Sequence, residues 1–221
     1  MLHSTRHLSI RLLLLSLLAL LPTSGLLAQH SITSSANLPE AGDKLTLQEI
    51  TGITPGSPGE NVTWDFSRYE VVRRDLPRHF AGDSLGYIRK QIGRYEYYAV
   101  SGDSVLLRAS RTSKELMRYG QPMLCMRYPL RYGDSIRGVF RGDGAYCKRY
   151  HLHREGARVT RVDAWGSILL PGNAKLMNVT RLHATTTYET LMSGMDAQRG
   201  DTATAGCEVV EEYRWYADGC R

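Results

Sequence analysis

The strongest constraint on the fold is a pattern of short β-prone segments separated by turn residues. Runs rich in Val, Ile, Tyr, Thr and Leu alternate with turn dipeptides, and no stretch of 11 or more residues has the apolar spacing of a helix face. Glycine adopts the positive φ of tight turns, and an aspartate side chain can cap them. The pattern therefore predicts a meandering antiparallel sheet. The dipeptide Gly-Asp occurs six times, beginning at Gly42, Gly82, Gly102, Gly133, Gly142 and Gly200.

Ten segments have the composition of strands, whereas Gly52–Glu60, with two prolines and three glycines, is predicted to be a loop. Turns about every 8–12 residues are typical of a sandwich or a barrel, and the uneven lengths of the strands favour the sandwich. We therefore expect an all-β fold, an antiparallel β-sandwich or meander, with little helix after the N-terminal segment. The predicted strands are Lys44–Ile50, Leu85–Ile92, Arg94–Val100, Ser104–Ala109, Met123–Tyr128, Ser135–Phe140, Ala145–Arg154, Arg158–Leu169, Leu176–Thr190 and Cys207–Tyr216.

The first 28 residues have the layout of a secretory signal peptide. Arg6 and Arg11 give a basic start without acidic residues, an apolar run follows from Leu12 to Leu21, and small residues precede the expected cleavage after Ala28. The apolar run is shorter than the roughly 20 residues that span a bilayer. We therefore expect residues 1–28 to be a signal peptide and residues 29–221 a single β-rich domain, exported to the periplasm, the cell surface or the extracellular space.

The charge of the chain argues against a nucleic-acid partner. The chain has 28 Lys and Arg against 22 Asp and Glu, and the segment removed by cleavage carries two of the basic residues and none of the acidic ones. The remaining excess of about four positive charges is spread along the chain, whereas nucleic-acid binding proteins cluster theirs on one face. No second apolar segment approaches the length of a membrane span.

Four cysteines follow the expected cleavage point: Cys125, Cys147, Cys207 and Cys220. An even number in an oxidising compartment permits two disulfides, in any of three connectivities. Pairing of sequence neighbours, Cys125 with Cys147 and Cys207 with Cys220, and free buried thiols both remain open. A zinc site is not expected, since no Cys-x-x-Cys spacing occurs.

Two short motifs resemble functional signatures. Gly82-Asp83-Ser84-Leu85 resembles the nucleophile block of the GDSL esterases, but no Asp-x-x-His follows it to supply the base that a serine nucleophile needs. Arg141-Gly142-Asp143 and Arg199-Gly200-Asp201 spell the tripeptide that integrins bind. Because Gly-Asp recurs throughout the chain, we interpret all of these as turns.

Histidine and arginine residues also recur in local patterns along the sequence. His151 and His153 share one face of a predicted strand, but Cys147 lies too far along that strand to join them in a metal site. The dipeptide Arg-Tyr occurs six times, and alternation along a strand would place the tyrosine inward and the arginine outward. Such an outward arginine array would favour anionic glycans. The arginines of these dipeptides are Arg68, Arg94, Arg118, Arg127, Arg131 and Arg149.

Three segments together resemble an uncharacterised family of exported, β-rich Bacteroidetes proteins. They are residues 32–43 with Asn61–Ser67, then Asp163–Pro171 with Asn178–Arg181, and last Tyr213–Tyr216 with Gly219. The resemblance spans nearly the whole chain after residue 28. It implies an exported β-rich domain, and many relatives carry a C-terminal signal for type IX secretion. The family offers no catalytic residue to carry over.

The leading functional hypothesis is a non-catalytic binding or envelope-interaction module, with a glycan or an envelope protein as partner. A hydrolase acting on envelope material and a structural envelope domain are the alternatives. No catalytic residue, metal site or cofactor is expected. Two convergent carboxylates about 5–10 Å apart would favour the hydrolase, and an exposed strip of aromatic rings would favour glycan binding. We expect Trp64, Trp165 and Trp215 mainly in the core.

Overall fold

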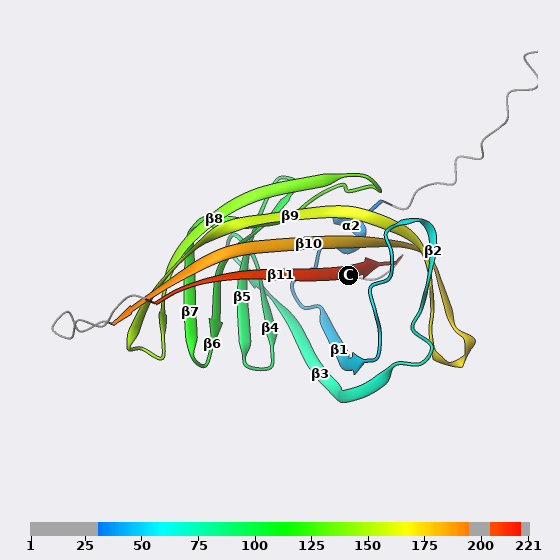
Figure 1. Ribbon diagram of the computed structural model, residues 1–221, viewed down its shortest axis with the longest axis horizontal. Coiled ribbons are helices and arrows are strands. Elements are labelled where there is room, and N and C mark those ends of the chain that lie inside the picture. Colours follow the sequence, from blue (N-terminus) through cyan, green and yellow to red (C-terminus); the bar gives the residue numbers. More distant parts are fainter. Residues whose placement is uncertain (1–30, 195–203, 218–221) are drawn as a thin grey trace, which may run out of the picture.

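The computed structural model describes residues 31–194 and 204–217, and this part of the chain is almost entirely β-structure (Figure 1). It contains one four-residue helix, α2 (Ser34–Asn37), and one 3₁₀ turn (Pro171–Asn173). The prediction of an all-β fold with little helix is confirmed for these residues. The strands are β1 (Lys44–Thr51), β2 (Gly59–Asp65), β3 (Glu70–Asp83), β4 (Gly86–Gln91), β5 (Arg94–Ser101), β6 (Ser104–Thr112), β7 (Glu115–Arg127), β8 (Ser135–Tyr146), β9 (Tyr150–Leu169), β10 (Lys175–Gly194) and β11 (Thr204–Tyr216).

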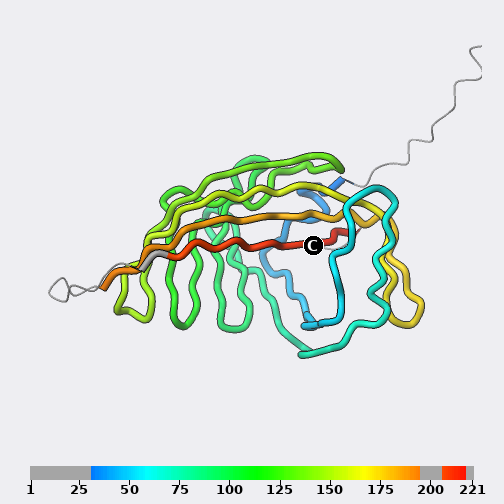
Figure 2. Tube along the Cα trace, viewed as in Figure 1, coloured from blue at the N-terminus to red at the C-terminus, as the bar shows by residue number. Residues whose placement is uncertain are grey.

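All the strands belong to one sheet with the order β1-β3-β4-β5-β6-β7-β8-β9-β10-β11. Successive neighbours are antiparallel, so the predicted meander is confirmed, and β2 alone adds parallel to the end of β9. The long strands β8–β11 cross in front of β4–β7 (Figures 1 and 2). The two layers of the fold therefore come from a single sheet that curves over onto itself.

The predicted strands match the structure best where turns carry glycine. Gly42, Gly102 and Gly133 occupy turns with φ of +102°, +58° and +90°, as expected. Gly82 and Gly142 instead lie within β3 and β8, so the prediction of turns there is wrong. Gly200 lies outside the described residues.

Three predictions of strand position need correction. The proposed strand Ala145–Arg154 is in fact the end of β8, a turn and the start of β9, and Cys147 and Lys148 form that turn with positive φ. The turn contains neither glycine nor proline, which is why the sequence gives no signal for it. β3 was not predicted because six charged residues and Pro77 interrupt its alternation. β2 was not predicted either, and its first two residues lie in the predicted loop Gly52–Glu60.

The main hydrophobic core lies on the concave side of the curved sheet. Alternate residues of β10, among them Leu182 and Ala184, point inward, where they join Val162 of β9 and Leu107 of β6. Ile32 is fully buried and forms a two-way backbone bridge with Leu130, which ties the segment before α2 to the segment between β7 and β8. The N-terminal part of the described chain thus covers the concave face near Leu130.

A second, smaller cluster surrounds the buried side chain of Arg181 on β10, which is 1% exposed. Its guanidinium pairs with both carboxylate oxygens of Asp163 at 2.9 Å and donates to the carbonyl oxygens of Pro55 and Gly56. The rings of Trp64 and Tyr213 also lie near it, with centroids 5.7 and 5.3 Å from the guanidinium carbon. Arg181 therefore fixes the loop before β2 against β9 and β10.

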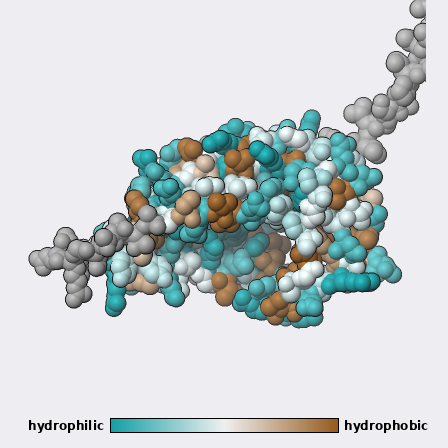
Figure 3. Space-filling model, viewed as in Figure 1, coloured by the Kyte–Doolittle hydropathy of each residue, from teal (hydrophilic) through white to brown (hydrophobic). Residues whose placement is uncertain are grey.

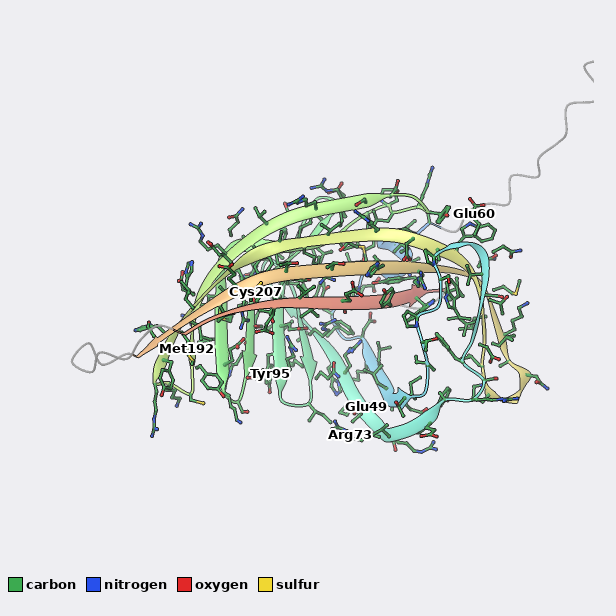
Figure 4. The ribbon with its side chains drawn as sticks, in the orientation of Figure 1. Glu49, Glu60, Arg73, Tyr95, Met192 and Cys207 are labelled. Carbon is green, nitrogen blue, oxygen red and sulfur yellow. The ribbon has the colours of Figure 1, made fainter. Side chains whose placement is uncertain are left out.

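Replacing Arg181 by methionine should cost about 3–5 kcal/mol, because the carboxylate of Asp163 would stay partly buried without its partner. The measurement is the free energy of unfolding in urea. Arg73→Met is the control, since its ion pair with Glu49 at 2.7 Å is exposed at the margin of the sheet (Figure 4) and should contribute less than about 1 kcal/mol. Equal losses in the two variants would contradict this account.

Gly166 of β9 lets β2 approach closely, since a Cβ there would lie 1.8 Å from the carbonyl oxygen of Val62. Gly166→Ala should therefore destabilise the protein by about 2 kcal/mol or more through overpacking. Gly120→Ala is the matched control, because a Cβ at Gly120 meets nothing within 4 Å. A Gly166→Ala protein as stable as the control would show that the two strands do not pair as described.

Candidate ligand-binding site

The candidate site is a cavity of about 710 Å³ between the two halves of the curved sheet, which we call the aromatic cavity. Residues of β3–β7 form its inner wall, and the C-terminal half of β11 forms its outer wall. Leu47 and Gln48 of β1 and Pro39 line its margin. The space-filling view shows the molecule hollowed beneath β11, with both apolar and polar surfaces in the hollow (Figure 3).

Tyrosine rings give this cavity its apolar surface. Tyr87 of β4 and Tyr98 of β5 stack with centroids 4.9 Å apart, and Phe80 of β3 packs edge-on against Tyr87 at 5.8 Å. Tyr128 is also buried in the lining. Burial raises the pKa of Tyr87, Tyr98 and Tyr128 above the ordinary value, so their hydroxyls keep their protons and stay available as hydrogen-bond donors.

Three arginines, Arg78, Arg89 and Arg214, also line the aromatic cavity, and no aspartate or glutamate of the described residues does. Alternation along the strands explains this position, because Arg89 follows Tyr87 by two residues and so faces the same side of β4. Within residues 31–194 and 204–217, Arg78 donates only to the neutral side chain of Gln91, at 3.0 and 3.3 Å. Burial and the like charges of Arg89 and Arg214 lower the pKa of Arg78, which shows how poorly its charge is compensated.

A second cavity of about 400 Å³ adjoins the first along Arg89, Tyr98, Cys125 and Arg214, and we call it the ion-pair cavity. Here Glu96, which is 6% exposed, accepts from Arg89 at 2.5 Å and from the hydroxyl of Tyr98 at 3.2 Å. Across the cavity Glu212 pairs with Arg158 at 2.8 Å and with Arg214 at 2.5 Å.

The balance of these charges is positive. Six arginines and three glutamates among the described residues line the two cavities, and a fourth glutamate, Glu115, pairs with one of these arginines from outside, which leaves two cations in excess. The arginines are Arg78, Arg89, Arg94, Arg154, Arg158 and Arg214, and the glutamates of the lining are Glu96, Glu211 and Glu212. Burial would raise the pKa of Glu212, but the charges and hydrogen bonds of Arg214 and Arg158 outweigh it and lower the pKa to about 2. Glu212 therefore stays ionised and is no proton donor. The arrangement is suited to holding an anion.

The motifs with a catalytic or adhesive resemblance do not form such sites. Asp83 ends β3 and pairs with Arg108, and of the four residues of this motif only Ser84 and Leu85 lie in the turn to β4. The tripeptide that begins at Arg141 lies inside β8, where Arg141 pairs with Glu155 at 3.0 Å and Asp143 with His153 at 2.7 Å. It is therefore a paired strand segment rather than an exposed adhesion loop. The copy that begins at Arg199 lies outside the described residues.

Histidine and cysteine side chains are not gathered into a site. His151 and His153 are on β9 and Cys147 is in the turn before it, and no group of three or more metal-ligating side chains occurs within the described residues. Cys125, Cys147 and Cys207 are free thiols. Cys125 is partly buried between the two cavities and burial raises its pKa, whereas Cys147 is exposed, so of the alternatives left open for these two residues the structure has free thiols. Cys220 lies outside the described residues.

The Arg-Tyr dipeptides follow the predicted alternation at two positions where strands are long. Tyr119 and Tyr128 are buried, and the arginines before them are exposed. At Arg94 the prediction is wrong, because Arg94 reaches back to Glu96 at 3.0 Å and Tyr95 is 41% exposed.

Among the tryptophans expected in the core, Trp64 is buried at 3% exposure. Trp215 is partly buried and packs edge-on against it at 6.0 Å. Trp165 is only partly buried, and its indole nitrogen has no hydrogen-bond partner. The residues that sequence reasoning missed are Arg78, Arg89, Arg158 and Arg214. Tyr87, Arg89 and Gln91 do alternate along β4, which is the one local signal that could have identified an inward-facing arginine.

The contribution of Glu212 to stability should depend on pH. A carboxyl group whose pKa is about 2 in the folded state and 4.5 unfolded stabilises the fold above about pH 4.5, and this contribution is lost as the pH falls towards 2. After allowance for partial exposure, Glu212→Gln should cost about 1–2 kcal/mol in urea unfolding at about pH 6 and about a quarter of that at about pH 2.5. Glu60→Gln, at an exposed position on β2 (Figure 4), is the control. A cost that does not change with pH would contradict the assignment.

No family model, curated protein or solved structure matches the chain. Function is therefore inferred from the residues and geometry of the two cavities.

Proposed function

We propose that the protein is an exported binding module that holds a small acidic molecule with an apolar ring or chain in the aromatic cavity. The observation that carries the proposal is the group of Arg78, Arg89 and Arg214 in a tyrosine-lined space whose described lining has no carboxylate. Arg89 and Arg214 have partners in the adjoining ion-pair cavity, whereas Arg78 has no carboxylate partner among the described residues. Buried like charges are costly unless a counter-charge approaches them. A bound anion would supply that counter-charge.

The size and lining of the cavity support a small ligand rather than a polymer. A volume of about 710 Å³ lies within the range of pockets that enclose cofactor-sized molecules. The stacked rings of Tyr87 and Tyr98 offer a flat apolar surface, and the arginines offer charge-assisted hydrogen bonds. A carboxylate or sulfonate on an apolar body, or an acidic sugar, has this combination of features.

The open ends of the sheet provide a route of entry. β1 and β11 are the two ends of the strand order and do not pair with each other. Residues of both strands line the aromatic cavity, with Leu47 and Gln48 on one side and Tyr213–Tyr216 on the other. A ligand therefore reaches the arginines between two unpaired strand edges, without unfolding of the sheet.

Binding is favoured over the alternative of an envelope-directed hydrolase by the state of the interior carboxylates. Glu96 and Glu212 are both held by arginines, and Glu212 is ionised down to a pKa of about 2. Hydrolysis by a carboxylate pair needs one member protonated near neutral pH. Export is supported by the basic start and apolar run of residues 1–28.

The test uses anilinonaphthalene sulfonate, a fluorescent aromatic sulfonate, titrated into the protein. We expect wild-type protein to bind it with enhanced fluorescence and Arg78→Met to bind it about tenfold more weakly, since a charge-assisted hydrogen bond is lost. Arg73→Met, which removes an exposed arginine from the same strand, should bind like the wild type. Glucuronate, an aromatic carboxylate and dodecanoate as competitors would identify the chemical class preferred.

N-phenylnaphthylamine, which has the same aromatic body without the sulfonate, is the neutral control. Its binding should be unchanged in Arg78→Met, because it makes no use of the arginine. If Arg78→Met and wild-type protein bind the sulfonate equally well, or if the neutral probe loses as much affinity as the charged one, the proposal is wrong.

A further inference from the structure

A second hollow lies on the outer, convex side of the sheet, and Tyr119 is the one residue of its described lining that also lines an interior cavity. It has a volume of about 910 Å³ and is formed by β5, β6, β7 and the turn between β8 and β9. Register shifts in β6–β7 between Leu107 and Ala109, and in β7–β8 between Arg118 and Gln121, bend the strands here. We call this hollow the convex groove.

The convex groove is strongly basic. Arg108, Arg111, Lys114, Arg118 and Lys148 line it, and Glu115 is its single acidic residue. Glu115 is engaged elsewhere, because its carboxylate pairs with Arg154 at 3.1 and 3.2 Å.

Only one of these cations has a carboxylate partner among the described residues, which is Arg108 paired with Asp83. Asp143 pairs in register with Arg118 across β7 and β8, but its carboxylate is bonded to His153 at 2.7 Å. Arg111 lies against the ring of Tyr95 at 5.9 Å, near the lower end of β5 in Figure 4. Arg111, Lys114, Arg118 and Lys148 are all exposed. Four cations thus face solvent around one groove without a counter-charge.

We infer that the convex groove binds an acidic polysaccharide. The cations come from the β6–β7 hairpin and from the turn between β8 and β9 and lie around an open surface, which suits a polyanion with charges repeated along its length. Tyr97, Leu116 and Pro122 provide an apolar floor against which the face of a sugar ring can pack. A membrane surface fits less well, because none of the exposed large apolar side chains of the described residues lines the groove to insert between lipids.

The test measures binding of fluorescently labelled polygalacturonate by the full mature chain, with neutral dextran as the reference. We expect binding that weakens as salt is raised, since exposed charges are screened, and no binding of dextran. The double variant Arg118→Gln with Lys148→Gln should bind roughly tenfold more weakly, because two solvent-exposed ionic contacts are lost.

The matched control is Arg73→Gln with Lys175→Gln, which removes the same charge from exposed positions away from the groove. It should retain wild-type affinity. Equal weakening of both double variants would show that only net charge matters and would overturn the proposal. If the protein binds a single-stranded oligonucleotide or phosphatidylglycerol vesicles more tightly than polygalacturonate, the proposal is also wrong. The groove variant should leave binding of anilinonaphthalene sulfonate unchanged, and Arg78→Met should leave binding of polygalacturonate unchanged. The proposals for the convex groove and for the aromatic cavity are therefore tested independently.

Discussion

The interior of this fold depends on how its buried arginines are neutralised. Glu212 lies between Arg158 and Arg214, and Glu96 binds Arg89 on the facing half of the sheet. Buried charges are tolerated only when paired and hydrogen-bonded. These ion pairs place charged groups in the middle of the curved sheet, beside residues of the main core such as Tyr98 and Phe140 that also line the cavities. The shortage of carboxylates then leaves Arg78 as the group that a ligand would neutralise.

Strand alternation distributes the basic residues of the chain between the two sides of one sheet. Arg89 and Arg214 point into the concave side, whereas Arg111 and Arg118 lie on the convex side. The two sides differ in kind, since the concave one encloses a small aromatic space and the convex one is an open groove. The even spread of positive charge along the sequence therefore conceals two concentrations of it in space, which would favour a small acidic ligand on one side and a polyanion on the other.

Local patterns were sufficient to predict the fold class and most strands, because alternation and glycine turns are properties of neighbouring residues. They failed at the turn of Cys147 and Lys148, which has no glycine, and at β3, where charged residues obscure the alternation. The arginines of the aromatic cavity could not be predicted from such local patterns. Arg78 and Arg214 meet only because the sheet curves through its whole strand order, so that β3 and β11 face one cavity. The sequence of a strand does not show whether one of its arginines faces solvent or the interior of the sheet.

The most direct test of the central claim is a nuclear magnetic resonance titration that observes the side-chain Nε–H groups of arginine while anilinonaphthalene sulfonate is added. Signals assigned by single substitution to Arg78, Arg89 and Arg214 should shift together with one dissociation constant, because all three line the aromatic cavity. The exposed Arg73 should not shift. Shifts confined to exposed arginines, with the three cavity signals unmoved at saturation, would contradict the assignment of this cavity as an anion-binding site.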